Sequence, residues 1–225
     1  MINAIILAGG KGKRMNAKVS KQYMSLNEKP ILYYTLKRFI ESKVIDKVIL
    51  VLSKDEIEYC KKEVLYKYNL DIDIIVEGGG ERQDSVFNAL KYVNNDDIVL
   101  IHDAARPFVS DKIINKGIEY ANFYGAAAPG VTPKDTIKIK NDNNFSISTP
   151  NRDYLVSIQT PQVFKGRIIK ECHEKIKKEN IAVTDDTMVV ERYDNKVYLY
   201  DGEYTNIKIT TPEDLILAEK LITYI

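Results

Sequence analysis

The chain has 225 residues, a length that suits one domain, and its 44% hydrophobic and 29% charged content is ordinary for a globular protein. Its 33 basic and 32 acidic residues leave a formal net charge of +1, which argues against nucleic acid as a partner. No apolar run approaches the roughly 18 residues of a membrane-spanning helix, so we expect no membrane partner.

Two cysteines and two histidines limit the possible cross-links and metal sites. Cys60 and Cys172 lie in helix-like patterns, and with His102 and His173 they match no disulfide framework or zinc spacing. The N-terminal apolar run is short, lacks a basic leader and ends in glycines, unlike a secretory signal. We therefore expect a cytoplasmic protein.

Short apolar runs alternate with segments of helical periodicity. In chain order, the pattern predicts a strand over 2–7, a helix over 30–40, a strand over 47–52, a helix over 55–68, a strand over 72–76, a helix over 82–93, a strand over 98–101, a helix over 111–124 and a strand over 126–131. This alternation predicts an α/β fold, a Rossmann-like three-layer sandwich around a mostly parallel central sheet.

Residues 132–157 interrupt the alternation. Two alternating segments, 136–139 and 145–148, flank the turn sequence Asn-Asp-Asn-Asn at 141–144, which predicts a β-hairpin. We expect a projecting β-arm at about 133–157, inserted in a single domain over 1–225. Because half of its surface is apolar, the arm needs a partner surface, and a homodimer is the simplest one.

The last part of the chain returns to the α/β pattern. It predicts helices near 166–178 and 185–193, a strand near 197–200, an extended run over 205–209 and a final helix over 212–222.

A glycine-rich loop follows the first strand. Gly9, Gly10 and Gly12 lie where ligands bind in such sheets, and glycine amides can approach phosphate closely. Met15 replaces the third glycine of the dinucleotide fingerprint, and the Walker A spacing is also absent. The nearby cations are Lys11, Lys13, Arg14 and Lys21. They suit a triphosphate; the alternative is a solvated basic loop.

Two further motifs follow later strands. Arg82 and Ser85 share one face of the helix after the glycines at 78–80, where amides could contact a base or ribose; a simple turn is the alternative. Asp103 ends the fourth strand, as an Mg²⁺ ligand beside phosphates would. Arg106 could hold phosphate or only pair with Asp103, and we expect a structural hydrogen-bonding role for His102.

An ordered series of motifs spans nearly the whole chain. It comprises Leu-Ala-Gly-Gly-x-Gly-x-Arg-Met at 7–15, Lys-Gln-Tyr at 21–23, Arg-x-x-Ser-Val at 82–86, His-Asp-Ala-Ala-Arg-Pro at 102–107, Thr-Pro-Gln at 160–162, Thr-Asp-Asp at 184–186 and Asn-Ile-Lys-Ile-Thr at 206–210. The series resembles the sugar/polyol-phosphate cytidylyltransferases, most closely the methylerythritol-phosphate branch of that family.

The resemblance implies a nucleotidyltransferase that moves CMP from CTP to 2-C-methyl-D-erythritol 4-phosphate, with Mg²⁺. The products would be 4-diphosphocytidyl-2-C-methyl-D-erythritol and pyrophosphate, in non-mevalonate isoprenoid precursor synthesis. Residues 202–212 also resemble the ribitol-5-phosphate cytidylyltransferases, which leaves ribitol 5-phosphate as the alternative acceptor. A nicotinamide dehydrogenase and a noncatalytic nucleotide sensor are the alternatives from other classes.

The resemblance also implies residue roles. Arg14, Lys21 and Lys208 would be catalytic at the triphosphate, and Asp103 would hold the metal. The CTP contacts would be Ala8, Gly9, Gly10, Gly12, Gly79, Gly80, Arg82, Ser85 and Ala104. The acceptor contacts would be Arg106, Thr136, Arg152, Thr160, Thr184 and Asp185. Of these, Thr136 and Arg152 would reach the acceptor across the dimer.

Overall fold

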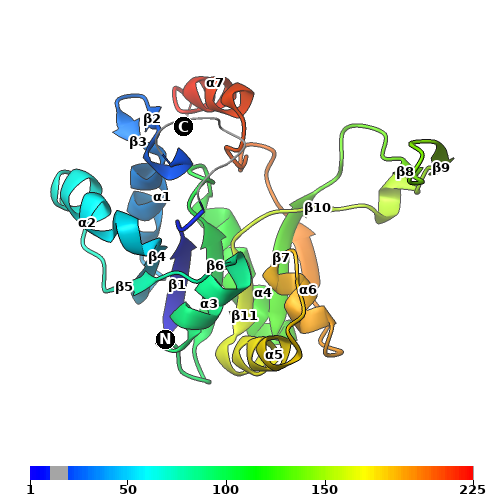
Figure 1. The fold of residues 1–225 in the computed structure, drawn as a ribbon, viewed down its shortest axis with the longest axis horizontal. Coiled ribbons are helices and arrows are strands. Elements are labelled where there is room, and N and C mark those ends of the chain that lie inside the picture. Colours follow the sequence, from blue (N-terminus) through cyan, green and yellow to red (C-terminus); the bar gives the residue numbers. More distant parts are fainter. Residues whose placement is uncertain (11–19, 225) are drawn as a thin grey trace.

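The computed structural model describes residues 1–10 and 20–224, and its centre is a sheet of eight strands among those residues (Figure 1). Its strand order is β10-β7-β11-β6-β1-β4-β5, with β12 beside β7. The strands are β1 (Ile2–Leu7), β4 (Lys47–Leu52), β5 (Ile74–Glu77), β6 (Ile98–Asp103), β7 (Ala126–Val131), β10 (Ser157–Ile158), β11 (Gln162–Lys165) and β12 (Tyr198–Asp201).

Helices cover both faces of the sheet. They are α1 (Ile31–Ile40), α2 (Ile57–Cys60), α3 (Arg82–Leu90), α4 (Asp111–Tyr124), α5 (Gly166–Glu179) and α6 (Asp186–Glu191). The last helix, α7 (Pro212–Leu221), lies away from these faces and packs near Leu26 and Ile31 (Figure 1). Successive residues of β1 divide between two cores: Ile6 packs with residues of α1, α2 and α4, and Ile5 packs with residues of α3, α5 and α6. The expected three-layer α/β sandwich is confirmed.

The sheet is mostly parallel, as expected. β1 pairs in parallel with β4 and β6, and β4 pairs in parallel with β5. The two-residue β10 runs antiparallel to β7. β11 is another exception, which the sequence did not predict: it lies between β6 and β7 and runs antiparallel to both. Only four residues long, it has too few positions to show a periodicity.

The helix expected over 55–68 differs in its winding. A 3₁₀ turn over Lys54–Glu56 leads into α2, and a π-helix follows over Lys61–Tyr66. The apolar side chains of Cys60, Val64 and Leu65 are still buried. Periodicity therefore located the buried face of this segment but not its helix type.

The hairpin prediction is confirmed. β8 (Ile139–Lys140) and β9 (Ser146–Ser148) pair with each other and stand away from the central sheet (Figure 1). The side chain of Asn141 accepts hydrogen bonds from the backbone of Asn143 and Phe145, which closes the turn. Large apolar side chains of the hairpin, including Ile147, are exposed. The short β2 (Ser25–Leu26) and β3 (Lys29–Pro30) form a separate ribbon.

Within the described ranges, we find no helix with the length and apolar content needed to cross a membrane.

Candidate nucleotide and phosphate site

The carboxyl ends of β1, β4, β5 and β6 surround a cavity of about 710 Å³. Most residues that the resemblance assigned to CTP, to catalysis or to the metal lie in its wall. They are Ala8, Gly9, Gly10, Lys21, Gly79, Gly80, Arg82, Ser85, Asp103, Ala104 and Lys208. Gly12 and Arg14, like Lys11 and Lys13, lie outside the described residues. The topology thus gathers motifs from widely separated parts of the chain at one edge of the sheet.

The turn after β1 is held in place by two polar residues that sequence reasoning missed. The buried Gln22 donates its side-chain amide to the carbonyl of Ala8 at 2.7 Å and to Glu56 at 2.9 Å. Ser53, just after β4, donates its hydroxyl to the carbonyl of Gly9 at 2.9 Å. A carbonyl oxygen that faced a phosphate would repel it. The hydrogen bonds from Gln22 and Ser53 hold the Ala8 and Gly9 carbonyl oxygens against protein groups instead.

The glycine turn before α3 is organised by Ser85. The Ser85 hydroxyl accepts from the Gly79 amide and donates to the Glu81 carbonyl, each at 3.1 Å. Glu81 and Asp84 form a capping box at the start of the helix. A Cβ on Gly79 would lie 2.1 Å from the Cβ of Asp84, so the turn admits only glycine there.

Replacing Gly79 with alanine is therefore expected to destabilise the protein by about 1–3 kcal/mol, because the backbone must shift to relieve the overlap. Gly80→Ala is the matched control, since its Cβ would approach Asp84 no closer than 3.8 Å. We expect the control to change stability by less than about 0.5 kcal/mol. Urea unfolding measures both variants, and equal stability losses would contradict this account of the turn.

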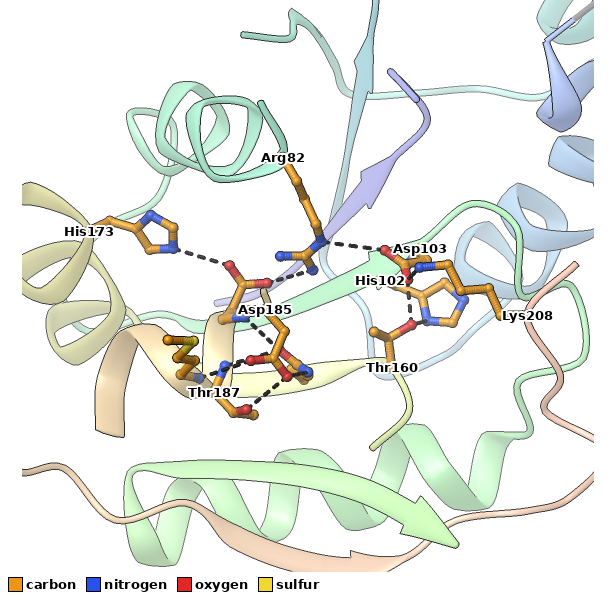
Figure 2. A network of polar contacts seen from close by, with 11 residues as sticks. Arg82, His102, Asp103, Thr160, His173, Asp185, Thr187 and Lys208 are labelled. Atoms are coloured by element: carbon orange, nitrogen blue, oxygen red, sulfur yellow. Dashed lines mark hydrogen bonds and ion pairs between the residues drawn. The ribbon is translucent and has the colours of Figure 1, made fainter. Parts of the chain in front are cut away.

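Five charged or polar side chains form a series of contacts that begins at the cavity wall and continues into the protein behind it (Figure 2). Lys208 Nζ lies 2.6 Å from one Asp103 oxygen, and Arg82 Nε lies 3.6 Å from the other. The same guanidinium reaches Asp186 at 2.7 Å, and Asp186 contacts His173 Nε2 at 3.1 Å. The sequence indicated Lys208, Asp103 and Arg82, but it missed Asp186 and His173.

The carboxylates of Asp103 and Asp186 are both ionised at neutral pH. Burial alone would raise the pKa of Asp103, but the charges of Arg82 and Lys208 outweigh it and hold that pKa well below its usual range. Burial also opposes ionisation of Asp186, whose pKa is nevertheless lowered by Arg82 and His173. Cationic and anionic groups therefore alternate beside the cavity.

Lys208 reaches the site because its segment is tied to the end of β6. The Ile209 amide donates to the Ala105 carbonyl at 2.9 Å. The Asn206 side chain donates to the Thr160 carbonyl at 3.0 Å, and Arg106 Nη1 donates to the Asn206 carbonyl at 2.7 Å. The extended run predicted over 205–209 thus delivers one lysine to the sheet edge without joining the sheet.

His102 supports Asp103 from behind, which confirms the expected structural role. The fully buried imidazole contacts the Arg106 carbonyl through Nε2 and the Thr160 hydroxyl through Nδ1, each at 3.1 Å. The Thr160 hydroxyl also accepts the Asp103 amide at 3.1 Å. Burial lowers the pKa of His102 to about 4, so the ring is neutral at pH 7.

That shift predicts a pH dependence of stability. Since the folded pKa of His102 lies below its unfolded value of 6.5, the unfolded state binds more protons as pH falls. The free energy of unfolding should therefore decrease by about 2 kcal/mol between pH 7 and pH 5. Urea unfolding at both pH values tests this prediction. In the His102→Gln variant, the free energy of unfolding should differ much less between pH 7 and pH 5. An equally steep loss in His102→Gln would contradict the assignment.

The residues assigned to the acceptor lie outside the cavity wall. Thr160 is buried behind Asp103, and Arg106 is directed to the Asn206 carbonyl. Asp185 caps α6 by accepting the Met188 amide at 2.9 Å, with Thr184 just before it. Thr136 and Arg152 lie exposed on the arm, which stands apart from the sheet (Figure 1).

Asp103 fits a metal that is held mainly by substrate. In the described part of the chain, no three acidic, histidine or cysteine side chains cluster as a metal cage would require. Mg²⁺ is commonly bound by one or two carboxylates together with substrate phosphates. Asp103 offers one ionised carboxylate at the cavity wall, which meets that minimal requirement.

Comparisons with known proteins place these features in a family. Residues 2–224 match the family model IspD, described as 2-C-methyl-D-erythritol 4-phosphate cytidylyltransferase. Curated proteins of that name from Clostridium beijerinckii and Clostridium botulinum are 64% and 61% identical over 222 residues, covering 99% of this chain and 98–99% of theirs. The crystal structure of 4-diphosphocytidyl-2C-methyl-D-erythritol synthase from Anaerococcus prevotii has a TM-score of 0.86 at 39% identity, covering 99% of this chain and 96% of its own.

Proposed function

The chain belongs to the 2-C-methyl-D-erythritol 4-phosphate cytidylyltransferase family, and we propose that it transfers CMP from CTP to 2-C-methyl-D-erythritol 4-phosphate. The products are 4-diphosphocytidyl-2-C-methyl-D-erythritol and pyrophosphate, which places the reaction in non-mevalonate isoprenoid synthesis. The observation that carries the proposal is the cavity at the sheet edge, where glycine turns meet Lys21, Arg82 and Lys208.

The chemistry requires positioning more than acid–base catalysis. A phosphate oxygen of the acceptor attacks the α-phosphorus of CTP in line, and the bond from that phosphorus to the bridging oxygen breaks. The nucleophile is already an anion, so no general base has to remove a proton. Catalysis then consists of holding two anions together and neutralising charge at the α-phosphate.

Cations from both ends of the chain provide that neutralisation. Lys21 and Lys208 line the cavity, and we assign them, together with Arg14, to the triphosphate and the reacting α-phosphate. Because Lys208 is paired with Asp103, its ammonium group is held in place before substrate arrives. Such preorganised charges stabilise a transition state without further reorganisation.

The two glycine turns frame the nucleoside. Backbone groups of the first turn and of the turn before α3 line the same cavity as Arg82. Ser85 shapes the second turn through its two hydrogen bonds. We assign base and ribose binding to this set: Ala8, Gly9, Gly10, Gly12, Gly79, Gly80, Arg82, Ser85 and Ala104.

Asp103 would help to hold Mg²⁺ when CTP is bound. When bound, the metal supplies positive charge that offsets the triphosphate and orients it. Within the protein, Arg82 and Lys208 keep Asp103 ionised and therefore able to act as a ligand.

The acceptor site would be completed by a second copy of the chain. Thr136 and Arg152 are exposed on an arm that is remote from its own sheet. A guanidinium binds phosphate through two parallel hydrogen bonds, which suits Arg152 to the acceptor phosphate. In a homodimer, the arm of one copy would approach the site of the other, near Arg106, Thr160, Thr184 and Asp185. The cytoplasmic location stays a prediction.

Pyrophosphate release tests this function. CTP and Mg²⁺ are incubated with 2-C-methyl-D-erythritol 4-phosphate or with D-ribitol 5-phosphate in parallel. We expect release with the first acceptor and none with the second or without an acceptor. Release with ribitol 5-phosphate alone would overturn the acceptor assignment while leaving cytidylyl transfer in place.

A further inference from the structure

The firmest partner of Arg82 lies behind the cavity wall. Arg82 is the first residue of α3 and its side chain is 30% exposed, whereas the side chain of Asp186 is only 1% exposed. The guanidinium lies 2.7 Å from Asp186 but 3.6 Å from Asp103 (Figure 2). A cation at the edge of the site is thus anchored by a carboxylate that the cavity does not reach.

Asp186 is itself held by two other elements. It is the first residue of α6, and its amide donates to the side chain of Gln162 on β11 at 3.0 Å. Its carboxylate meets Nε2 of His173 on α5 at 3.1 Å, and the His173 side chain is also 1% exposed. Each oxygen of the carboxylate therefore faces one partner, Arg82 on one side and His173 on the other.

Stability alone does not account for such an arrangement. Burying an ion pair costs desolvation energy, and well-packed apolar side chains of similar size often stabilise a protein as well or better. An apolar replacement, however, could not fix the place of a guanidinium. Asp186 and Asp103 share Arg82, and Asp103 also binds Lys208 at 2.6 Å. Without the charge of Asp186, Arg82 would turn to Asp103 and compete with Lys208 for it.

We propose that Asp186, oriented by His173, is a positioning residue that fixes Arg82 at the nucleotide cavity and so preserves the pairing of Asp103 with Lys208. The inference deepens the proposed function and rests on it, because Arg82 is there a CTP contact. Asp186 and His173 touch no substrate in this account and act only through Arg82.

Kinetics of Asp186→Asn test the proposal, since this change removes the charge and keeps the volume. We expect kcat/KM for CTP to fall about tenfold, while KM for the acceptor stays within about twofold. In an Arg82→Gln background, adding Asp186→Asn should change kcat/KM for CTP by less than about twofold, because Asp186 acts on CTP only through Arg82 and that side chain is absent. An equal loss in both backgrounds, or wild-type kinetics in folded Asp186→Asn, would overturn the proposal.

His173 provides a second pair of variants should Asp186→Asn not fold. His173→Gln keeps a side-chain N–H donor for Asp186, whereas His173→Phe does not. We expect His173→Phe to weaken CTP binding about threefold or more and His173→Gln to restore it. Equal CTP affinity in the two variants would contradict the role of His173.

Calorimetric titration with CTP separates this inference from the proposed function, because it needs no turnover. If the wild-type protein binds CTP but releases pyrophosphate with neither acceptor, the function fails. The affinities of the Asp186 and His173 variants would still decide whether these residues position Arg82. If the wild-type protein does not bind CTP, both proposals fail.

Discussion

Replacing Lys208 with alanine is expected to lower kcat about 10²–10³-fold, the usual effect of losing one preorganised charge at a transition state. The lysine lines the cavity and is held 2.6 Å from Asp103, so the variant loses the ammonium group and leaves the carboxylate less neutralised. Steady-state pyrophosphate release with saturating CTP and acceptor gives kcat directly.

Lys220→Ala is the matched control for that experiment. Lys220 is an exposed lysine of α7, and its loss should leave kcat unchanged. Circular dichroism and urea unfolding establish whether each variant is folded. A folded Lys208→Ala protein with wild-type kcat would remove this residue from the reaction.

Replacing Arg152 with alanine is expected to lower kcat/KM for the acceptor about 10²-fold or more, since a bidentate charged contact to phosphate is lost. KM for CTP should change little, because the nucleotide cavity is formed by other elements. Lys140→Ala on the same exposed arm is the control and should retain wild-type kinetics. A loss confined to CTP binding would contradict the assignment of Arg152 to the acceptor.

Mixing two inactive variants tests whether the arm serves a second copy. Lys208→Ala and Arg152→Ala proteins are unfolded together, refolded and assayed. A mixed dimer contains one site with an intact Lys208 and an intact Arg152 from the other copy, so we expect activity to return to about a quarter of the wild-type level with random pairing. No recovery in a confirmed mixed dimer would show that Arg152 acts within its own chain or not at all.

The sequence predicted the sheet best where local signals were strong. The strands β1, β4 and β6 are each six residues long and contain the predicted apolar runs 2–7, 47–52 and 98–101. β11 has only four residues. Its place in the sheet is set by its pairing with β6 and β7, which lie much earlier in the sequence. No local pattern carries that information.

In the site, too, features with a local signal in the sequence were predicted and features set by distant contacts were not. Glycine turns and a carboxylate at a strand end could be located from the order of the residues alone. The resemblance assigned Asp185 to the acceptor and gave Asp186 no role, but the roles of these adjacent carboxylates depend on where α6 starts. Asp185 caps the helix, while Asp186 turns inward to Arg82.

Buried polar supports were the hardest features to foresee. His173 lies in a helix with an otherwise ordinary periodicity, and only the packing of α5 against α6 brings it to Asp186. Gln22 likewise has no signal in the sequence beyond its place beside Lys21. Such residues contact other protein groups, so their function appears only when the fold is known.

The identity of the product from a competition reaction tests the central claim most directly. The protein is given CTP and Mg²⁺ with equal concentrations of 2-C-methyl-D-erythritol 4-phosphate and D-ribitol 5-phosphate. The products are separated by chromatography and identified by mass spectrometry. We predict one new product, the cytidine diphosphate ester of methylerythritol, in amounts equal to the pyrophosphate released. A product formed only from ribitol 5-phosphate, or CTP hydrolysis without any ester, would contradict the account.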